Sequence, residues 1–161
     1  LAAYGPASVK DMQTWSGLTR LAPAFEAVSD RLVIFAGEDG RTLYDLPDAP
    51  RPDPDMPAPV RFLPDYDNVF LGFADRFRTQ PPYAKDRMVV VNGYVATFTV
   101  DGFIAGNWTQ SRKKDVLTLS LAPFRKLSKK EMIDVEREGR AMAGFLTDGG
   151  AEITTEFVSS D

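Results

Sequence analysis

Six of the twelve prolines in this 161-residue chain fall within residues 47–59. Proline has no backbone N–H and a fixed φ, so this segment can enter neither a helix interior nor a central strand. Closely spaced prolines favour polyproline II, which predicts a semi-rigid connector. We therefore expect two folded parts, residues 1–46 and 60–161, joined by a connector over residues 47–59.

The N-terminal part shows two helices followed by a hairpin. Ser8 is a suitable N-cap for a first helix, which the turn residues Ser16-Gly17 should end. A second helix is expected over residues 19–29, and two short strands over 32–35 and 42–44 flank a glycine-bearing turn. Helix, turn, helix and hairpin in this order predict a winged helix.

The C-terminal part shows strands joined by hairpin turns and followed by a helix. Asn92-Gly93 and Asp101-Gly102 are strong hairpin signals. Ser128 and Glu131 form a capping box for a helix that runs to about Leu146. Further elements are expected over residues 60–63, 67–73, 116–121 and 153–158. Adjacent antiparallel strands with tight turns favour closure, so the expected fold class is α+β: a winged helix followed by a small antiparallel β-barrel with a C-terminal helix.

The chain contains neither cysteine nor histidine. Disulfides, thiolate metal sites, histidine-ligated zinc and Ser-His-Asp catalysis are therefore excluded for these residues. The run from Asp65 to Asn68, followed by Asp75, offers carboxylates for a divalent cation, but capping by Asp67 with local ion pairing is the commoner use. We expect no catalytic residue, metal or cofactor. No apolar run is long enough to span a bilayer, so we expect a cytoplasmic chain without a membrane partner.

Positive charge gathers in the third quarter of the chain. Residues 76–130 hold eleven basic and three acidic residues, although the net charge of the whole chain is −4. Three adjacent cations are expected at a hairpin tip, where they would contact a phosphate backbone or enter a groove: Arg112, Lys113 and Lys114. The alternative is a solvated turn that keeps a β-protein soluble. Three more cations are expected to support that surface: Arg76, Arg78 and Lys85. Four others flank a helix start, where they oppose the helix dipole and so point to another role: Arg125, Lys126, Lys129 and Lys130.

The expected recognition helix and wing carry little positive charge. The helix has Arg20 against Glu26, and the wing turn contains Glu38 and Asp39. Reading base edges requires Arg, Lys, Asn or Gln, and phosphate contacts require cations. A scaffold role is favoured for this winged helix, with direct DNA contact as the alternative.

Six motifs follow one another along nearly the whole chain: Gly5-Pro6-Ala7-Ser8, Trp15-Ser16-Gly17-Leu18, Leu43-Tyr44-Asp45-Leu46-Pro47, Leu63-Pro64-Asp65-Tyr66-Asp67-Asn68 with Phe73-Ala74-Asp75-Arg76, Val100-Asp101-Gly102-Phe103-Ile104-Ala105-Gly106-Asn107-Trp108, and Leu121-Ala122-Pro123-Phe124. Together they resemble the C-terminal half of bacterial winged-helix DNA-binding domain proteins, a family that includes the AlkZ-like DNA glycosylases. The resemblance implies a role in repair of alkylated or crosslinked DNA, with a winged helix and a β-barrel as the last parts of a longer protein. Members often carry a histidine where this chain has Phe73.

The resemblance also places the family's catalytic element, a Gln-x-Gln or Gln-x-Asp motif, in the N-terminal half. The glutamines of this chain, Gln13, Gln80 and Gln110, each stand alone. We therefore expect the DNA-binding portion of such a protein, with duplex DNA and the remaining N-terminal half as partners. A start at Leu1 rather than methionine agrees with a fragment. The alternative is a regulatory or scaffolding module that binds a protein or a small ligand.

Overall fold

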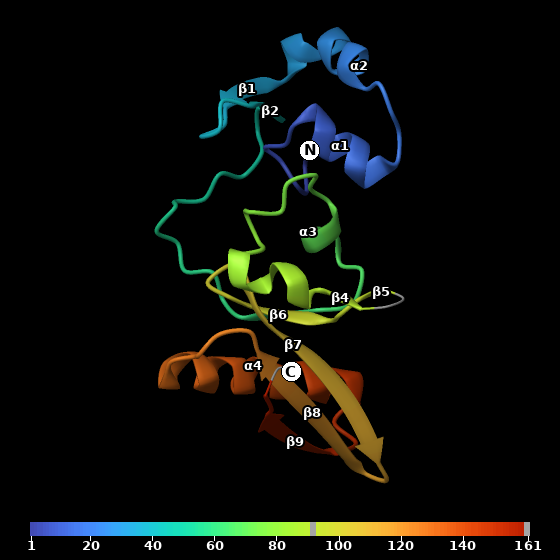
Figure 1. The fold of residues 1–161 in the computed structure, drawn as a ribbon, viewed down its shortest axis with the longest axis vertical. Coiled ribbons are helices and arrows are strands. Elements are labelled where there is room, and N and C mark those ends of the chain that lie inside the picture. Colours follow the sequence, from blue (N-terminus) through green and yellow to red (C-terminus); the bar gives the residue numbers. More distant parts are fainter. Residues whose placement is uncertain (91–92, 160–161) are drawn as a thin grey trace. The chain divides into compact units, whose positions relative to one another are not determined.

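The computed structural model describes residues 1–90 and 93–159, and they form two compact units (Figure 1). Unit 1 comprises Leu1–Met56 and Asn68–Arg76, and unit 2 comprises Pro57–Asp67 and Phe77–Asp161. The first change of unit falls at Met56, inside the proline-rich segment, which forms no helix or strand. Residues 68–76, placed in the second part by the sequence, pack with unit 1 instead.

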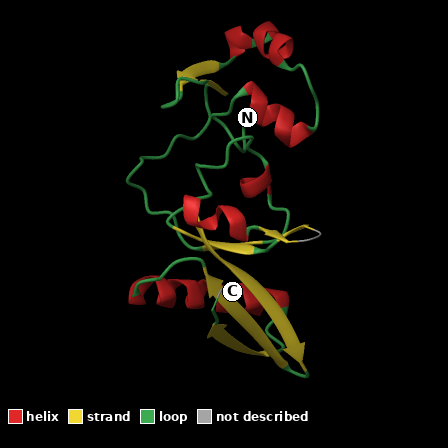
Figure 2. Cartoon of the chain, in the orientation of Figure 1, coloured by secondary structure: helices red, strands yellow, loops and turns green. Residues whose placement is uncertain are grey.

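Unit 1 contains two helices and a hairpin in the expected order (Figure 2). Its elements are α1 (Val9–Ser16), α2 (Ala22–Ala27), the 3-10 helix η1 (Ser29–Arg31), β1 (Val33–Ala36), β2 (Thr42–Asp45) and α3 (Asn68–Leu71). α1 begins at Ser8 in a capping box and ends at Gly17, whose φ of 71° suits glycine. α2 is shorter than expected because Arg20 adopts a φ of 59° and Pro23 occupies its first turn.

The N-terminal segment pairs with the hairpin. Ala7 and Tyr44 exchange two backbone hydrogen bonds of 2.9 and 2.8 Å, which form an isolated antiparallel bridge beside β2. Asp45 is almost fully buried, and Arg51 Nη1 donates to its Oδ2 at 3.2 Å. Gly5 lies against the same carboxylate, since a Cβ at this position would come within 2.3 Å of Asp45 Oδ1. Close packing at Gly5 and a paired carboxylate therefore hold the start of unit 1 to its hairpin.

Unit 2 is built on a five-stranded sheet with the order β3-β6-β7-β8-β9. These strands are β3 (Arg61–Leu63), β6 (Thr97–Val100), β7 (Phe103–Lys113), β8 (Val116–Pro123) and β9 (Glu152–Phe157). The other elements are the 3-10 helix η2 (Pro82–Arg87), the short pair β4 (Val89–Val90) and β5 (Gly93–Tyr94), and α4 (Lys129–Leu146). The Asp101-Gly102 turn joins β6 to β7, with φ of 52° and 77°. The other expected turn, Asn92-Gly93, lies partly outside the described residues.

The sheet is open, so the predicted closed barrel is wrong. β9 runs parallel to β8, because α4 carries the chain back along the sheet before β9 begins. Among the described residues, β3 and β9 are the two edges and do not pair with each other. Turn signals report only the contact between strands that follow each other directly. They therefore could not reveal a crossover through a helix.

α4 covers one face of this sheet. Val135, Gly139 and Ala143 are buried on the side of α4 that meets the sheet, and Leu119 faces them from β8. Gly139 permits a close approach, because a Cβ there would lie 3.0 Å from Phe62 Cζ. The expected capping box at Ser128 and the expected end at Leu146 are both confirmed. No described helix combines the length and the apolar character needed to cross a membrane.

Gly139→Val should lower the free energy of unfolding by about 2 kcal/mol, since the added methyl groups collide with Phe62 and Leu119 in a packed core. Gly144→Ala is the matched control in the same helix, because its nearest neighbour would be Ile153 Cδ1 at 3.9 Å. It should gain up to about 1 kcal/mol from helix propensity. Urea unfolding measures both, and an equal effect of the two substitutions would contradict the packing argument.

Candidate nucleic-acid interface

The three adjacent cations lie at the tip of the β7–β8 hairpin (Figure 1). Lys113 pairs with Val116, so the turn itself consists only of Lys114 and Asp115. Lys114 adopts a φ of 54° to close this turn. β7 therefore continues to Lys113, and all three cations are exposed on a regular hairpin.

Consecutive side chains of a strand point to opposite faces of its sheet. Arg112 lies opposite Leu117, whose side chain faces the core, whereas Lys113 lies opposite Val116 on the uncovered face. The two cations thus project to opposite sides of the hairpin, and Lys114 lies at its end. A tip with positive charge on both sides matches a groove whose two walls carry phosphates.

The tip cations are not neutralised by neighbouring carboxylates. Among the described residues, neither Arg112, Lys113 nor Lys114 forms an ion pair within 4.0 Å. The Nε atom of Arg112 donates only to the backbone oxygen of Lys114, at 3.3 Å. Cations on α4 differ: Lys130 and Arg137 each contact Asp134 at 2.8 Å. The tip is therefore a concentrated source of uncompensated positive charge.

Two of the supporting cations, Arg78 and Lys85, lie in the same unit as the tip but away from it. Arg76 belongs to unit 1, where its guanidinium lies 4.1 Å from the centre of the Phe70 ring. Arg78 and Lys85 lie near the start of β7, where Ile104 N donates to Thr79 O at 2.8 Å. Nine residues separate this start from Lys113, which is about 30 Å along an extended strand. Within unit 2, the fold therefore separates Arg78 and Lys85 from the tip, although the sequence analysis assigned all of them to one surface.

The hairpin of unit 1 is poor in available positive charge. α2 contains no basic residue, and Arg20 precedes it. In the β1–β2 turn, Arg41 contacts both Asp39 and Asp75, the latter at 3.2 Å. The backbone N–H of Arg41 donates to Asp39 and lowers the pKa of that carboxyl. This turn presents an internally compensated charge pair to solvent.

The acidic run does not assemble into a metal site. Asp65 and Asp67 belong to unit 2, whereas Asp75 belongs to unit 1 and pairs with Arg41. Within residues 1–90 and 93–159, no group of three or more acidic side chains is placed to hold a metal ion.

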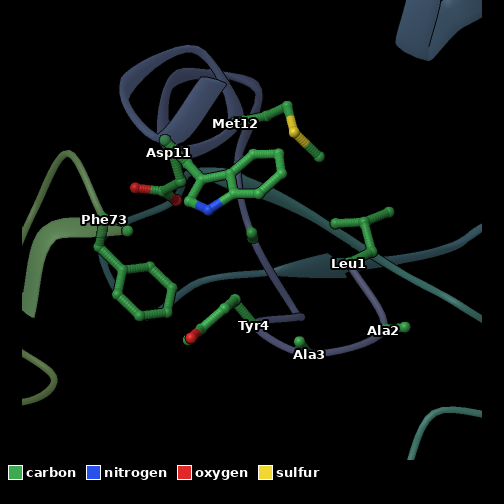
Figure 3. A pocket seen from close by; sticks show the side chains of 10 residues that line it. Leu1, Ala2, Ala3, Tyr4, Asp11, Met12 and Phe73 are labelled. Carbon is green, nitrogen blue, oxygen red and sulfur yellow. The ribbon is translucent and has the colours of Figure 1, made fainter. Parts of the chain in front are cut away.

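Unit 1 also contains an apolar cavity of about 280 Å³ (Figure 3). Phe73 lines it and packs edge-on against Tyr4, with ring centres 6.3 Å apart, at the position where the family resemblance suggests a histidine. Asp11 is buried in the wall and accepts hydrogen bonds from Ser8 N and Ala74 N, both at 2.8 Å. This carboxylate ties α1 to residues 68–76, so its role in the cavity wall is structural.

A second cationic cluster joins Arg87 to the cations expected at a helix start. Arg87 of η2 donates from Nη1 to Phe124 O at 3.1 Å, which joins segments 37 residues apart. Next to it, Arg125 Nη2 contacts Glu131 Oε1 at 2.6 Å. The Arg125 guanidinium, together with the Ser128 N–H, lowers the pKa of Glu131 to about 2. Opposition to the helix dipole was the one sequence signal that pointed to this cluster.

This fold and sequence define the family of the chain. The family described as DNA glycosylase AlkZ-like matches residues 1–145, and the chain belongs to it. The solved structure of Streptomyces sahachiroi DNA glycosylase AlkZ matches 97% of this chain with a TM-score of 0.71 and 21% sequence identity, which shows a shared fold. The chain spans 43% of the length of that solved chain. No curated protein matches the sequence.

Glu131→Gln should weaken unit 2 at neutral pH. Its ordinary pKa of 4.5 falls to about 2 on folding, so the charge stabilises the fold above about pH 4.5 and stops doing so as the pH falls toward 2. We expect a loss of about 0.5–1 kcal/mol at pH 7, since the pair is partly exposed. The difference from the parent should vanish near pH 2 in urea unfolding. Glu152→Gln is the control, since Glu152 forms no ion pair among the described residues, and an equal pH-dependent loss there would contradict the assignment.

Proposed function

We propose that this chain is the DNA-gripping part of an AlkZ-like DNA glycosylase and that the β7–β8 tip is its contact with duplex DNA. The observation that carries the proposal is the set of three exposed cations on a regular hairpin, none of them ion-paired among the described residues. Family membership supports DNA as the partner.

The outer part of β7 supports contact with DNA. β6 and the residue before it pair with β7 only as far as Trp108, so residues 109–113 bond to β8 alone among the described strands. This outer part of β7 is Thr-Gln-Ser-Arg-Lys, and every side chain in it is exposed. On its other side β8 pairs with β9 over Val116–Leu121, so the outer part of β7 is the free edge of a three-stranded region of the described sheet, and its exposed polar side chains are placed to donate to phosphates.

Unit 1 has the element order of a winged helix, and we propose that it serves as a scaffold. Two helices, the β1–β2 hairpin and the bridge from Ala7 to Tyr44 support that assignment. The absence of basic residues from α2 and the pairing of Arg41 with two carboxylates disfavour phosphate contact there.

We further propose that base excision of alkylated or crosslinked DNA requires residues outside this chain. The glutamines present have other roles. Gln13 Oε1 accepts from Leu21 N at 3.0 Å, and Gln80 Nε2 donates to Lys85 O at 3.4 Å. Gln110 is exposed on the outer part of β7. None of them belongs to the paired motif that the family resemblance implies for catalysis.

Fluorescence anisotropy with a 16-bp duplex, from about 20 to 200 mM salt, tests the DNA contact. Counterion release gives a log-log slope of about −0.9 for each neutralised phosphate, so a tip that makes three contacts contributes about −3. The variant R112Q/K113Q/K114Q should lose most of this contribution and bind less tightly at every salt concentration.

The matched control R61Q/R137Q/R140Q removes the same charge from cations that are already ion-paired. It should bind nearly as well as the parent, and circular dichroism checks that both variants fold. Equal weakening by the two variants would mean that net charge alone is responsible. Absence of binding by the parent chain at low salt would refute the proposal in favour of a scaffolding module.

A further inference from the structure

We infer that unit 2 holds a second contact for the same DNA duplex, at the opposite end of the β7–β8 hairpin from its tip. This inference rests on the proposed function. The site, here called the loop patch, is formed by η2 and by the segment between β8 and α4. Its exposed cations are Lys85, Arg87, Lys126 and Lys129.

Two contacts bring the parts of the loop patch together. Arg87 donates to Phe124 O and lies 5.8 Å from the centre of the Phe124 ring. One turn of η2 earlier, Tyr83 lies beside Arg125 and helps to raise the pKa of that guanidinium. Lys85 therefore lies on the same short helix that packs against the segment carrying Lys126, although about forty residues separate them in sequence.

Positive charge in the loop patch exceeds what the fold neutralises. Residues 82–87 and 124–131 hold six basic and two acidic residues. Arg125 is compensated by Glu131, and Lys130 is compensated by Asp134. In the described part of the chain, Lys85, Lys126 and Lys129 form no ion pair within 4.0 Å. The carboxylates of these two segments are Asp86, next to Lys85, and Glu131, which is paired with Arg125.

The position of Lys129 is electrostatically unfavourable, and a bound phosphate would offset this unfavourable energy. It is the first residue of α4, where the positive end of the helix dipole disfavours a cation. The N-terminus is already capped by Ser128 and Glu131, so Lys129 is not needed to complete the helix. An unfavourable cation beside other unpaired cations is expected where an anionic partner binds.

The spacing between the loop patch and the tip is set within one sheet. Phe124 N donates to Ala105 O at 2.8 Å, so the patch adjoins β7 at Ala105. Eight residues of paired strand connect Ala105 to Lys113, which is about 27 Å. At 3.4 Å per base pair this equals about eight base pairs of B-DNA.

A stiff duplex suits this arrangement. DNA is rigid over about 150 base pairs, so one duplex laid along the hairpin would present phosphates to both ends without bending. A flexible single strand or an acidic peptide would gain less from a fixed spacing. We therefore commit to duplex DNA as the occupant of both sites.

Binding to DNA of two lengths tests the inference with the full chain. The variant K85Q/K126Q/K129Q should bind a 16-bp duplex about tenfold less tightly than the parent at 50 mM salt, with a log-log salt slope smaller by about two units. A stem-loop with a six-base-pair stem offers only about 20 Å of duplex, which is shorter than the spacing between the two sites. The same variant should lose at most about twofold on that stem.

Each outcome separates this inference from the proposed function. Parent-like binding of the 16-bp duplex by the loop-patch variant, with weakening by R112Q/K113Q/K114Q, would overturn the second contact and leave the tip in place. An equal loss of affinity by the loop-patch variant on both DNA lengths would contradict simultaneous contact of one duplex with the tip and the loop patch. If a 16-nucleotide single strand binds with the same affinity and the same salt slope, duplex DNA is not the preferred occupant and that part of the inference is wrong. Failure of the parent to bind any of these DNAs would refute the proposed function itself. R61Q/R137Q/R140Q, with the same loss of charge, should match the parent on both lengths.

Discussion

The parallel pairing of β9 with β8 is the constraint on which unit 2 depends. It requires a crossover, and α4 provides that crossover while covering the core face of the sheet. The close approach of α4 depends on Gly139, which lies against Phe62 and Leu119. Because the segment that leads from β8 into α4 contacts η2 at Phe124, the same crossover also places Lys126 and Lys129 at one end of the hairpin. The core and the distribution of surface charge therefore have a common origin.

The outer part of β7 must satisfy two demands. An exposed strand edge invites pairing with another chain, and charged residues are a common protection against it. Arg112 and Lys113 supply this protection because they alternate across the two faces of the hairpin. The other edge is protected differently: Arg140 donates to Ile153 O at 2.7 Å and so occupies a β9 carbonyl. The cation that protects β9, Arg140, is bound to that strand. Arg112 and Lys113, which protect β7, can also contact a partner.

Local signals in the sequence predicted local structure well. The N-cap at Ser8, the capping box at Ser128 and the Asp101-Gly102 turn all depend on neighbours along the chain, and the structure contains each of them. Contacts between distant residues could not be read in this way. The direction of β9 depends on where a helix packs, and the loop patch depends on one hydrogen bond between Arg87 and Phe124. The DNA-contact residues themselves stay a prediction, because charge shows where a phosphate would be favoured and not whether one binds.

Residues 68–76 give the chain an interleaved connectivity. The backbone passes from unit 1 to unit 2, returns for nine residues and leaves again, so the chain crosses between the units three times. Cutting at the proline-rich segment would separate Asp11 from Ala74 N and leave a buried carboxylate without one of its donors. A single cut in the proline-rich segment therefore does not separate the chain into two intact units. Recombination at the most visible boundary in the sequence would remove residues 68–76 from unit 1, so joint inheritance of the two units is expected.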